Sequence, residues 1–119
     1  MNKNIVILLN NLGVPMHLKG YKYLINAIEM CQENEDIRMS KELYVHIAHR
    51  YKDAPSRVER SIRHAIEVAW TRSCINCELI DAVFGSSIDI NKNKPTNAQF
   101  CKTIANYLKY DLGGVKNGN

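Results

Sequence analysis

The chain has 119 residues, of which 45% are hydrophobic and 24% are charged. This length and composition predict a single globular domain with a real core and exclude a largely disordered chain. Lys and Arg together number 16 against 12 Asp and Glu, so the formal net charge of +4 permits a polyanionic partner without requiring one.

The first predicted helix covers about residues 4–12 and ends before Gly13 and Pro15, which are typical of a helix exit. It contains the longest apolar run of the chain, residues 5–9. That run is shorter than the ~20 residues of a bilayer span and the ~7–15 residues of a signal-peptide core. We therefore expect no membrane partner and a cytoplasmic location.

Two more amphipathic helices follow along the chain. A second helix is predicted over about residues 21–32, because apolar side chains recur there every three or four residues. Ser40 is expected to cap a third helix, after a polar linker at residues 33–39. The residues of this third helix that are expected to face the core are Leu43, Ile47, Ala48 and Tyr51.

The fourth helix is the most strongly patterned and extends to about Arg72, with two alternatives for its start. Ser56 and Glu59 match a capping box, in which both side chains would serve the helix start. Alternatively, Pro55 occupies the first helical position, which suits its fixed φ and leaves Glu59 free to face a ligand. Both starts are compatible with the sequence.

A fifth helix is predicted over residues 77–84, and a last helix opens at a T-x-x-Q capping box formed by Thr96 and Gln99. Residues 86–95 have some strand character but are too short and polar for a sheet. The predicted fold class is therefore all-α, with about six helices in one domain over residues 1–112 and a flexible tail at residues 113–119. The residues of the last helix that are expected to be buried are Phe100, Ile104, Ala105 and Leu108.

The sequence does not indicate metal, redox or enzyme chemistry. Cys74 and Cys77 form a C-x-x-C, but Cys31 and Cys101 are isolated, so the second close pair of a structural zinc site is missing. We expect buried or half-buried thiols, no metal and no cofactor. The sequence shows no close nucleophile–base–carboxylate set and no phosphate loop, so we expect the chain not to be an enzyme.

The third and fourth helices have the layout of a helix-turn-helix over about residues 41–72, in which the second helix enters the DNA major groove. On a helical wheel of residues 56–71, at about 100° per residue, small and branched apolar residues lie on one side. These are Val58, Ile62, Ala65, Ile66 and Ala69. The opposite side carries Arg60, Arg63, His64 and Glu67, with Arg57 at its margin.

The outward side of the fourth helix suits DNA recognition. The planar fork of arginine donates two hydrogen bonds to guanine O6 and N7 or holds a phosphate, and a carboxylate accepts from the amino group of cytosine. Six basic and three acidic residues lie between Arg50 and Arg72, so this segment holds +3 of the net +4. A merely solvated helix face is the alternative interpretation of the same charges.

Residues 56–70 read SRVERSIRHAIEVAW and resemble the effector domain of the sporulation master response regulator, the stage zero sporulation protein A family. The family motif reads SRVERAIRHAIEVAW, so only Ser61 differs. Residues 13–24, GVPMHLKGYKYL, are similar to the G-V-P-x-H-x-K-G-Y-x-Y-L stretch of the family, and residues 94–97, KPTN, match a later segment. The resemblance spans roughly residues 5 to 110 in unbroken order.

The resemblance implies a six-helix DNA-binding domain that activates or represses transcription in spore-forming bacteria, as the output of a two-component system. It also implies that the partner is double-stranded DNA with short promoter elements, on which two copies can sit head-to-tail. The positions that match the DNA-contacting residues of the family are Arg57, Glu59, Arg60, Arg63 and His64.

Two segments depart from the family pattern. Residues 52–55 read KDAP where the family prefers N-T-T-A, and residues 86–90 read SSIDI where the family typically has Y-T-V-S. The family uses the second region toward RNA polymerase and its sigma factor, so DNA binding is better supported here than polymerase contact. Lys92 and Lys94, which follow this region, are expected in a solvated loop rather than on phosphates.

Two functions from different classes follow from these observations. The leading expectation is a sequence-specific regulator of transcription that binds double-stranded DNA. The alternative is a stand-alone interaction module that antagonises a full-length regulator by pairing with it or by occupying its sites. We expect no receiver domain, because Met1 lies just before the first effector helix. Promoter binding and transcription by the isolated chain discriminate between the two functions.

Overall fold

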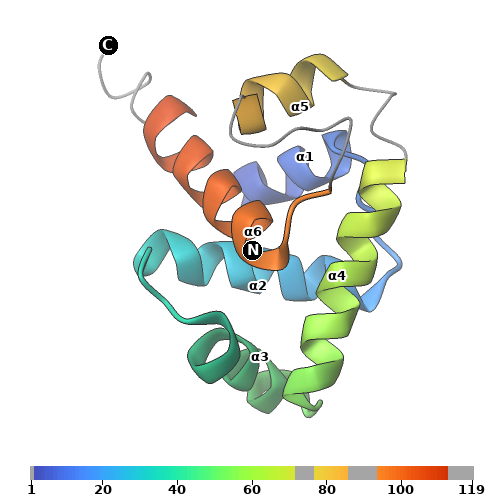
Figure 1. Cartoon of the computed structure of the whole chain (residues 1–119), viewed down its shortest axis with the longest axis vertical. Coiled ribbons are helices and arrows are strands. Elements are labelled where there is room, and N and C mark those ends of the chain that lie inside the picture. Colours follow the sequence, from blue (N-terminus) through green and yellow to red (C-terminus); the bar gives the residue numbers. More distant parts are fainter. Residues whose placement is uncertain (1, 72–76, 86–93, 113–119) are drawn as a thin grey trace.

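The helices follow the predicted order along the chain (Figure 1). The computed structural model describes residues 2–71, 77–85 and 94–112. Their α-helices are α1 (Lys3–Asn11), α2 (Lys19–Glu33), α3 (Tyr44–Tyr51), α4 (Pro55–Thr71), α5 (Cys77–Phe84) and α6 (Asn97–Asn106). One π-helical turn, Met39–Leu43, runs into α3, and another, Tyr107–Leu112, continues α6. These described ranges contain no strand, and the predicted all-α class is confirmed.

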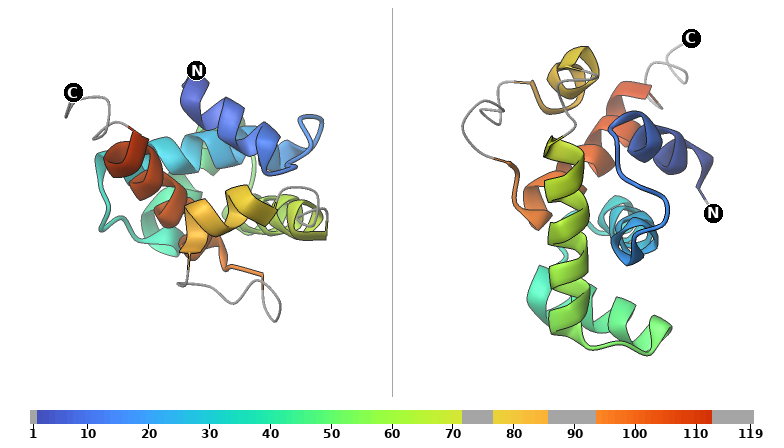
Figure 2. Two further views of the ribbon diagram at one scale, coloured as in Figure 1. Left: turned by 90° about the horizontal axis from the view of Figure 1, so that it is seen from above. Right: turned by 90° about the vertical axis from the view of Figure 1, so that its right-hand side faces the viewer.

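Helix α2 crosses the middle of the molecule, and α1, α3, α4 and α6 pack against it (Figures 1 and 2). Nine of its 15 residues are buried, because protein covers it on more than one side. Helix α5 packs on α6. The predicted core positions of the last helix are confirmed, since each of the four side chains is at most 6% exposed: Phe100, Ile104, Ala105 and Leu108.

Gly20 lets α2 and α4 approach each other closely. A Cβ atom at this position would overlap the carbonyl oxygen of Ser61 and would lie 2.8 Å from the Cβ of Ala65. Both partners belong to α4, and a carbonyl oxygen cannot rotate out of the way as a side chain can. The absence of a side chain at Gly20 therefore sets the distance between the central helix and α4.

The start of α6 agrees with the sequence. Thr96 accepts a hydrogen bond from the backbone N–H of Gln99 at 3.1 Å, and the side chain of Gln99 accepts from the backbone N–H of Thr96 at 2.9 Å. This reciprocal pair is the predicted capping box. The bounds of α5 also match the prediction, and Gly85 follows it with a positive φ of 55°.

The expected capping role of Ser40 is wrong. Ser40 lies inside the π-helical turn Met39–Leu43, and the turn is closed by the N–H of Leu43, which donates to the carbonyl of Arg38 at 3.0 Å. The backbone N–H of Arg38 is satisfied by the Glu42 side chain at 2.9 Å instead. That hydrogen bond lowers the pKa of Glu42. The N-cap position is Arg38, two residues before Ser40. Glu42, from within the turn, supplies the side-chain acceptor at this helix start.

A short turn joins α3 to α4. Lys52 has φ 55° and ψ 50°, a left-handed conformation that ends α3, and the N–H of Asp53 donates to the carbonyl of Ala48 at 2.8 Å. Helix α4 then begins at Pro55, so the alternative with proline at the first helical position is correct. The capping box of Ser56 and Glu59 is wrong, because both residues already lie within the helix.

Several sequence predictions fall outside the described residues. These are the strand-like character of residues 86–93, the tail at residues 113–119, and Cys74 together with the side chain of Cys77. The other two cysteines, Cys31 and Cys101, are buried free thiols, and burial raises the pKa of Cys31 to about 11. Among the described helices, none combines the length and the apolar composition that a membrane crossing requires.

Candidate nucleic-acid interface

Helix α4 has the two faces that the helical wheel predicts. Its five predicted inward residues are each at most 1% exposed, and the helix packs on α2, α3 and α6. The right-hand view of Figure 2 shows α4 in front of the other helices, with its outer side turned to the viewer. The exposed residues opposite the buried side of the helical wheel are Arg57, Arg60, Arg63, His64 and Glu67. The basic face of this helix is therefore open to a large ligand.

The predicted site residues lie together on α4, but their charges are not equally available. Arg63 donates to Glu59 with 2.6 Å between Nη1 and Oε2, one helical turn apart. Arg57 is 71% exposed, and its Nη1 lies 3.9 Å from Oδ1 of Asp53. Arg60 has no ion pair within the described part of the chain. We call the exposed side of α4 its outward sector. Among the arginines of this sector, Arg60 lies closest to the centre.

Glu59 is half-buried and acts on a neighbour rather than on the helix start. Its carboxylate holds one donor of Arg63, and guanidinium has five, so the remaining donors stay available to a ligand. The spacing of four residues with Glu before Arg is the favourable order for such a pair on a helix. The sequence spacing alone therefore predicts this ion pair.

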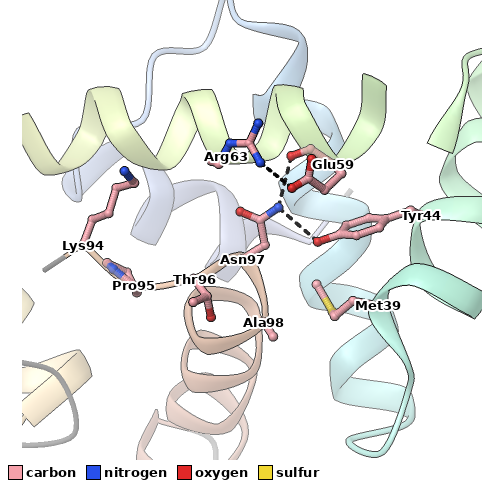
Figure 3. A pocket seen from close by; sticks show the side chains of 9 residues that line it. All are labelled: Met39, Tyr44, Glu59, Arg63, Lys94, Pro95, Thr96, Asn97 and Ala98. Carbon is pink, nitrogen blue, oxygen red and sulfur yellow. Dashed lines mark hydrogen bonds and ion pairs between the residues drawn. The ribbon is translucent and has the colours of Figure 1, made fainter. Parts of the chain in front are cut away.

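A hollow of about 630 Å³ lies between α4, the start of α6 and the π-helical turn before α3 (Figure 3). Arg63 and Glu59 reach into it from α4, and Lys94 approaches from the other end. The ammonium of Lys94 lies 3.5 Å from the Glu67 carboxylate. The residues that line the hollow are Met39, Tyr44, Glu59, Arg63, Lys94, Pro95, Thr96, Asn97 and Ala98.

Asn97 fixes the wall of this hollow to α4. Its side-chain amide is 8% exposed and donates to the hydroxyl of Tyr44 at 3.0 Å and to the backbone carbonyl of Glu59 at 3.1 Å. Burial raises the pKa of Tyr44, while the hydrogen bond from Asn97 acts in the opposite direction. Both donor hydrogens of the amide are thereby used. The first residue of α6 is thus tied to both helices of the helix-turn-helix.

The turn before α4 is anchored to α2 through an almost covered carboxylate. Asp53 accepts from the hydroxyl of Tyr23 at 2.6 Å and from the backbone N–H of Ala54 at 2.8 Å. Its side chain is 6% exposed. These two hydrogen bonds lower the pKa of Asp53, and burial together with the same carboxylate raises the pKa of Tyr23 to about 12.

A second polar link joins α2 to the end of α3. The side-chain amide of Asn26 donates to the hydroxyl of Tyr51 at 2.6 Å, and its oxygen accepts from Arg50 at 2.6 Å. The rings of Tyr23 and Tyr51 lie 5.4 Å apart, so the two links form one contiguous cluster. The cluster ties the end of α3 and the turn before α4 to α2, through contacts that no motif in the sequence revealed.

The comparison with known proteins agrees with this geometry. The family model for the sporulation initiation factor Spo0A C terminal matches residues 5–108. The chain belongs to this family. The match includes all of α1 to α6 apart from the first two residues of α1, so the relationship covers the whole helical core and not the helix-turn-helix alone.

Membership in this family indicates the kind of partner that the chain binds. The domain of this family is a DNA-binding effector domain of sporulation regulators, a regulatory and not an enzymatic family. DNA is accordingly the partner of the chain. The departures at residues 52–55 acquire a structural meaning as well, because Asp53 in this turn carries the anchor to Tyr23.

The anchor predicts a pH-dependent effect of Tyr23→Phe. Loss of the hydroxyl leaves an almost covered carboxylate short of one donor, so the free energy of unfolding is expected to fall by about 1–3 kcal/mol at pH 7. Because the folded-state pKa of Asp53 is depressed, its contribution is present above its unfolded pKa and is lost as pH falls through the folded value. Urea unfolding at pH 7 and at successively lower pH measures this difference.

Tyr21→Phe is the matched control for that variant. The hydroxyl of Tyr21 donates to the neutral side-chain oxygen of Asn10 at 2.7 Å, two residues from Tyr23 on the same helix. It is expected to cost less stability than Tyr23→Phe, and its cost should not shrink toward low pH. If the two variants lose equal stability with the same pH profile, the anchor assigned to Asp53 is wrong.

Proposed function

We propose that this chain regulates transcription by binding specific sequences of double-stranded DNA, with α4 in the major groove. The observation that carries the proposal is the outward sector of α4, where exposed basic side chains project from a helix whose other face is fully buried. A helix in this position fits the ≈ 12 Å width of the major groove, and its side chains then reach the base edges. The preceding helix and turn act as the support.

The individual roles follow from position and from available donors. Arg60 is the candidate reader of a guanine, since it occupies the centre of the sector. Arg57 lies at the margin beside the turn and is the candidate phosphate contact. Glu59 orients Arg63 through their ion pair, and His64 completes the sector on the opposite edge. The five residues act together, and none of them is assigned a catalytic role.

Methylation interference on the intact chain tests the groove assignment. Dimethyl sulfate modifies guanine at N7 in the major groove and adenine at N3 in the minor groove. We expect binding to a cognate element to be blocked by methylation of particular guanines and to tolerate methylation of adenines. Interference from adenines alone would contradict placement of α4 in the major groove, and equal binding to scrambled duplexes would contradict sequence specificity.

Transcription in vitro from the same promoter separates the regulator from the antagonist. A regulator is expected to change the transcript level when it is the only family member present. A chain that binds or pairs without changing transcription would support the interaction module instead. Head-to-tail pairing on DNA and contact with the sigma factor stay predictions of the family resemblance, and residues 86–90 lie outside the described ranges.

A further inference from the structure

One edge of α4 carries a stripe of three charged residues, two of which line the hollow. Glu59, Arg63 and Glu67 are spaced four residues apart, which places them along one side of the helix. Lys94 meets this stripe from the segment before α6, and its ammonium pairs with Glu67 across 27 positions of sequence. Figure 3 shows Lys94 at one end of the hollow, with Arg63 between it and Glu59 along α4. The hollow therefore brings together two cations from two separate elements.

The part of the stripe that lines the hollow, Glu59 and Arg63, lies at the margin of the DNA-facing sector, whereas Glu67 lies near its centre, only about 20° from Arg60. At about 100° per residue, Arg63 is rotated by about 60° from Arg60, and Glu59 by about 100° in the same direction. When a helix lies in the major groove, the residues at the centre of its outward sector meet base edges, and those at its margins meet the sugar–phosphate strands. The hollow consequently opens toward the place of one phosphate strand.

We propose that this hollow seats the phosphate backbone of one DNA strand, with Lys94 as the contacting cation. The inference rests on the proposed function, because it depends on α4 occupying the groove beside that strand. It adds to the predicted DNA contacts a residue that lies outside the helix-turn-helix. It also revises the sequence-based expectation that Lys94 belongs to a solvated loop.

Lys94 can leave its ion pair with Glu67 to bind a DNA phosphate. The side chains of Lys94 and Glu67 are 44% and 46% exposed, and an ion pair between groups this exposed contributes little stability in water. A DNA phosphate offers Lys94 a charge-assisted hydrogen bond and releases a condensed counterion from the duplex. In the free protein, the Glu67 carboxylate keeps the ammonium at the rim of the hollow, close to where the phosphate would lie.

The wall behind Lys94 is rigid enough to hold it there. Lys94 precedes Pro95, which is buried, and Thr96, which caps α6. Asn97 then fixes the start of α6 to Tyr44 and to the backbone of Glu59. The anchor of this segment lies three residues from Lys94, so little backbone freedom is lost when its ammonium binds a phosphate.

Salt titrations of three variants test the proposal. Lys94→Ala is expected to weaken binding to cognate and scrambled duplexes by the same factor and to reduce the slope of log K against log salt by about 0.9. Lys94→Arg should keep the wild-type slope, because it keeps the charge. Lys109→Ala removes an exposed lysine from the turn that continues α6, and it should change neither quantity. Thermal melts should be near wild type for all three variants.

Duplexes that carry one uncharged phosphate analogue each can locate the backbone position that Lys94 contacts. In a series of duplexes with one methylphosphonate each, one position should weaken the wild-type chain as much as Lys94→Ala does and should cost the Lys94→Ala variant nothing more. Inorganic phosphate should compete no better than chloride at equal ionic strength, which separates a seat for the DNA strand from a site for a free anion. Specific competition by inorganic phosphate would overturn the proposal.

The remaining outcomes separate this inference from the proposed function. An unchanged salt slope in Lys94→Ala, or equal losses at every methylphosphonate position, would show that Lys94 does not contact the backbone. If guanine methylation still interferes with binding in that case, α4 remains in the major groove and only the role of the hollow is refuted. If neither guanine methylation nor any neutral phosphate affects binding, the proposed function itself fails.

Discussion

Arg60→Ala is expected to weaken binding to the cognate DNA by about 1–3 kcal/mol and to relax the preference at a single base pair. The side chain lies at the centre of the outward sector of α4, and it has no ion pair within the described residues, unlike Arg63. Its planar fork is therefore available to donate to O6 and N7 of one guanine. Competition binding across all single-base variants of the element measures both effects.

The controls for Arg60 separate recognition from charge and from folding. Binding to scrambled DNA should fall much less, because phosphate contacts by other cations persist. Arg60→Lys should also lose discrimination, since an ammonium cannot reproduce the bidentate fork. The melting of both variants should be close to wild type, because exposed substitutions usually change stability by less than ~0.5 kcal/mol. A variant that melts normally and ranks every base as wild type does would show that Arg60 does not read the sequence.

Local periodicity was sufficient to predict the faces of α4 but not its surroundings. Its buried and exposed residues follow from the 3.6-residue repeat, and Pro55 and the capping box of Thr96 follow from local chemistry. Local rules failed at Ser40, where a carboxylate inside the turn serves the helix start from within. Signals that act over four residues or fewer are therefore visible in the sequence, but where two of them compete, as Ser40 and Glu42 do, the sequence does not show which one prevails.

The parts of the site that could not be predicted depend on contacts between distant segments. Tyr23 and Asp53 are 30 residues apart, and Asn97 and Tyr44 are 53 apart. Polar pairs of this kind have no periodic pattern, because their geometry exists only once the helices are packed. The same holds for Lys94, whose position beside Glu67 gives a loop residue a place at the candidate interface. The exposed residues of α4 were predictable, whereas the distant groups that hold this helix in place were not.

Gly20→Ala is expected to destabilise the domain and to displace α4. In an ordinary helical position, replacing glycine with alanine raises stability by roughly 0.5–1 kcal/mol, because glycine has the higher conformational entropy when unfolded. Here the added methyl group meets the Ser61 carbonyl oxygen, so the backbones of α2 and α4 must separate. Overpacking of this kind typically costs about 1–3 kcal/mol, which reverses the sign that helix propensity alone would give. Urea unfolding measures the change in midpoint and slope.

The second-site variant Ala65→Gly shows which contact at Gly20 matters. It removes the Cβ atom 2.8 Å from the position of the new methyl group, but it leaves the Ser61 carbonyl in place. The double variant is therefore expected to remain less stable than Ala65→Gly alone. Its DNA binding should be weaker than that of the wild type, because α4 is displaced from its support on α2. Full recovery of stability in the double variant would show that the clash is between the Cβ atoms at positions 20 and 65, and not with the Ser61 carbonyl. A Gly20→Ala protein more stable than wild type would mean that α2 and α4 are farther apart in solution, and that the position of the DNA-facing helix does not depend on this glycine.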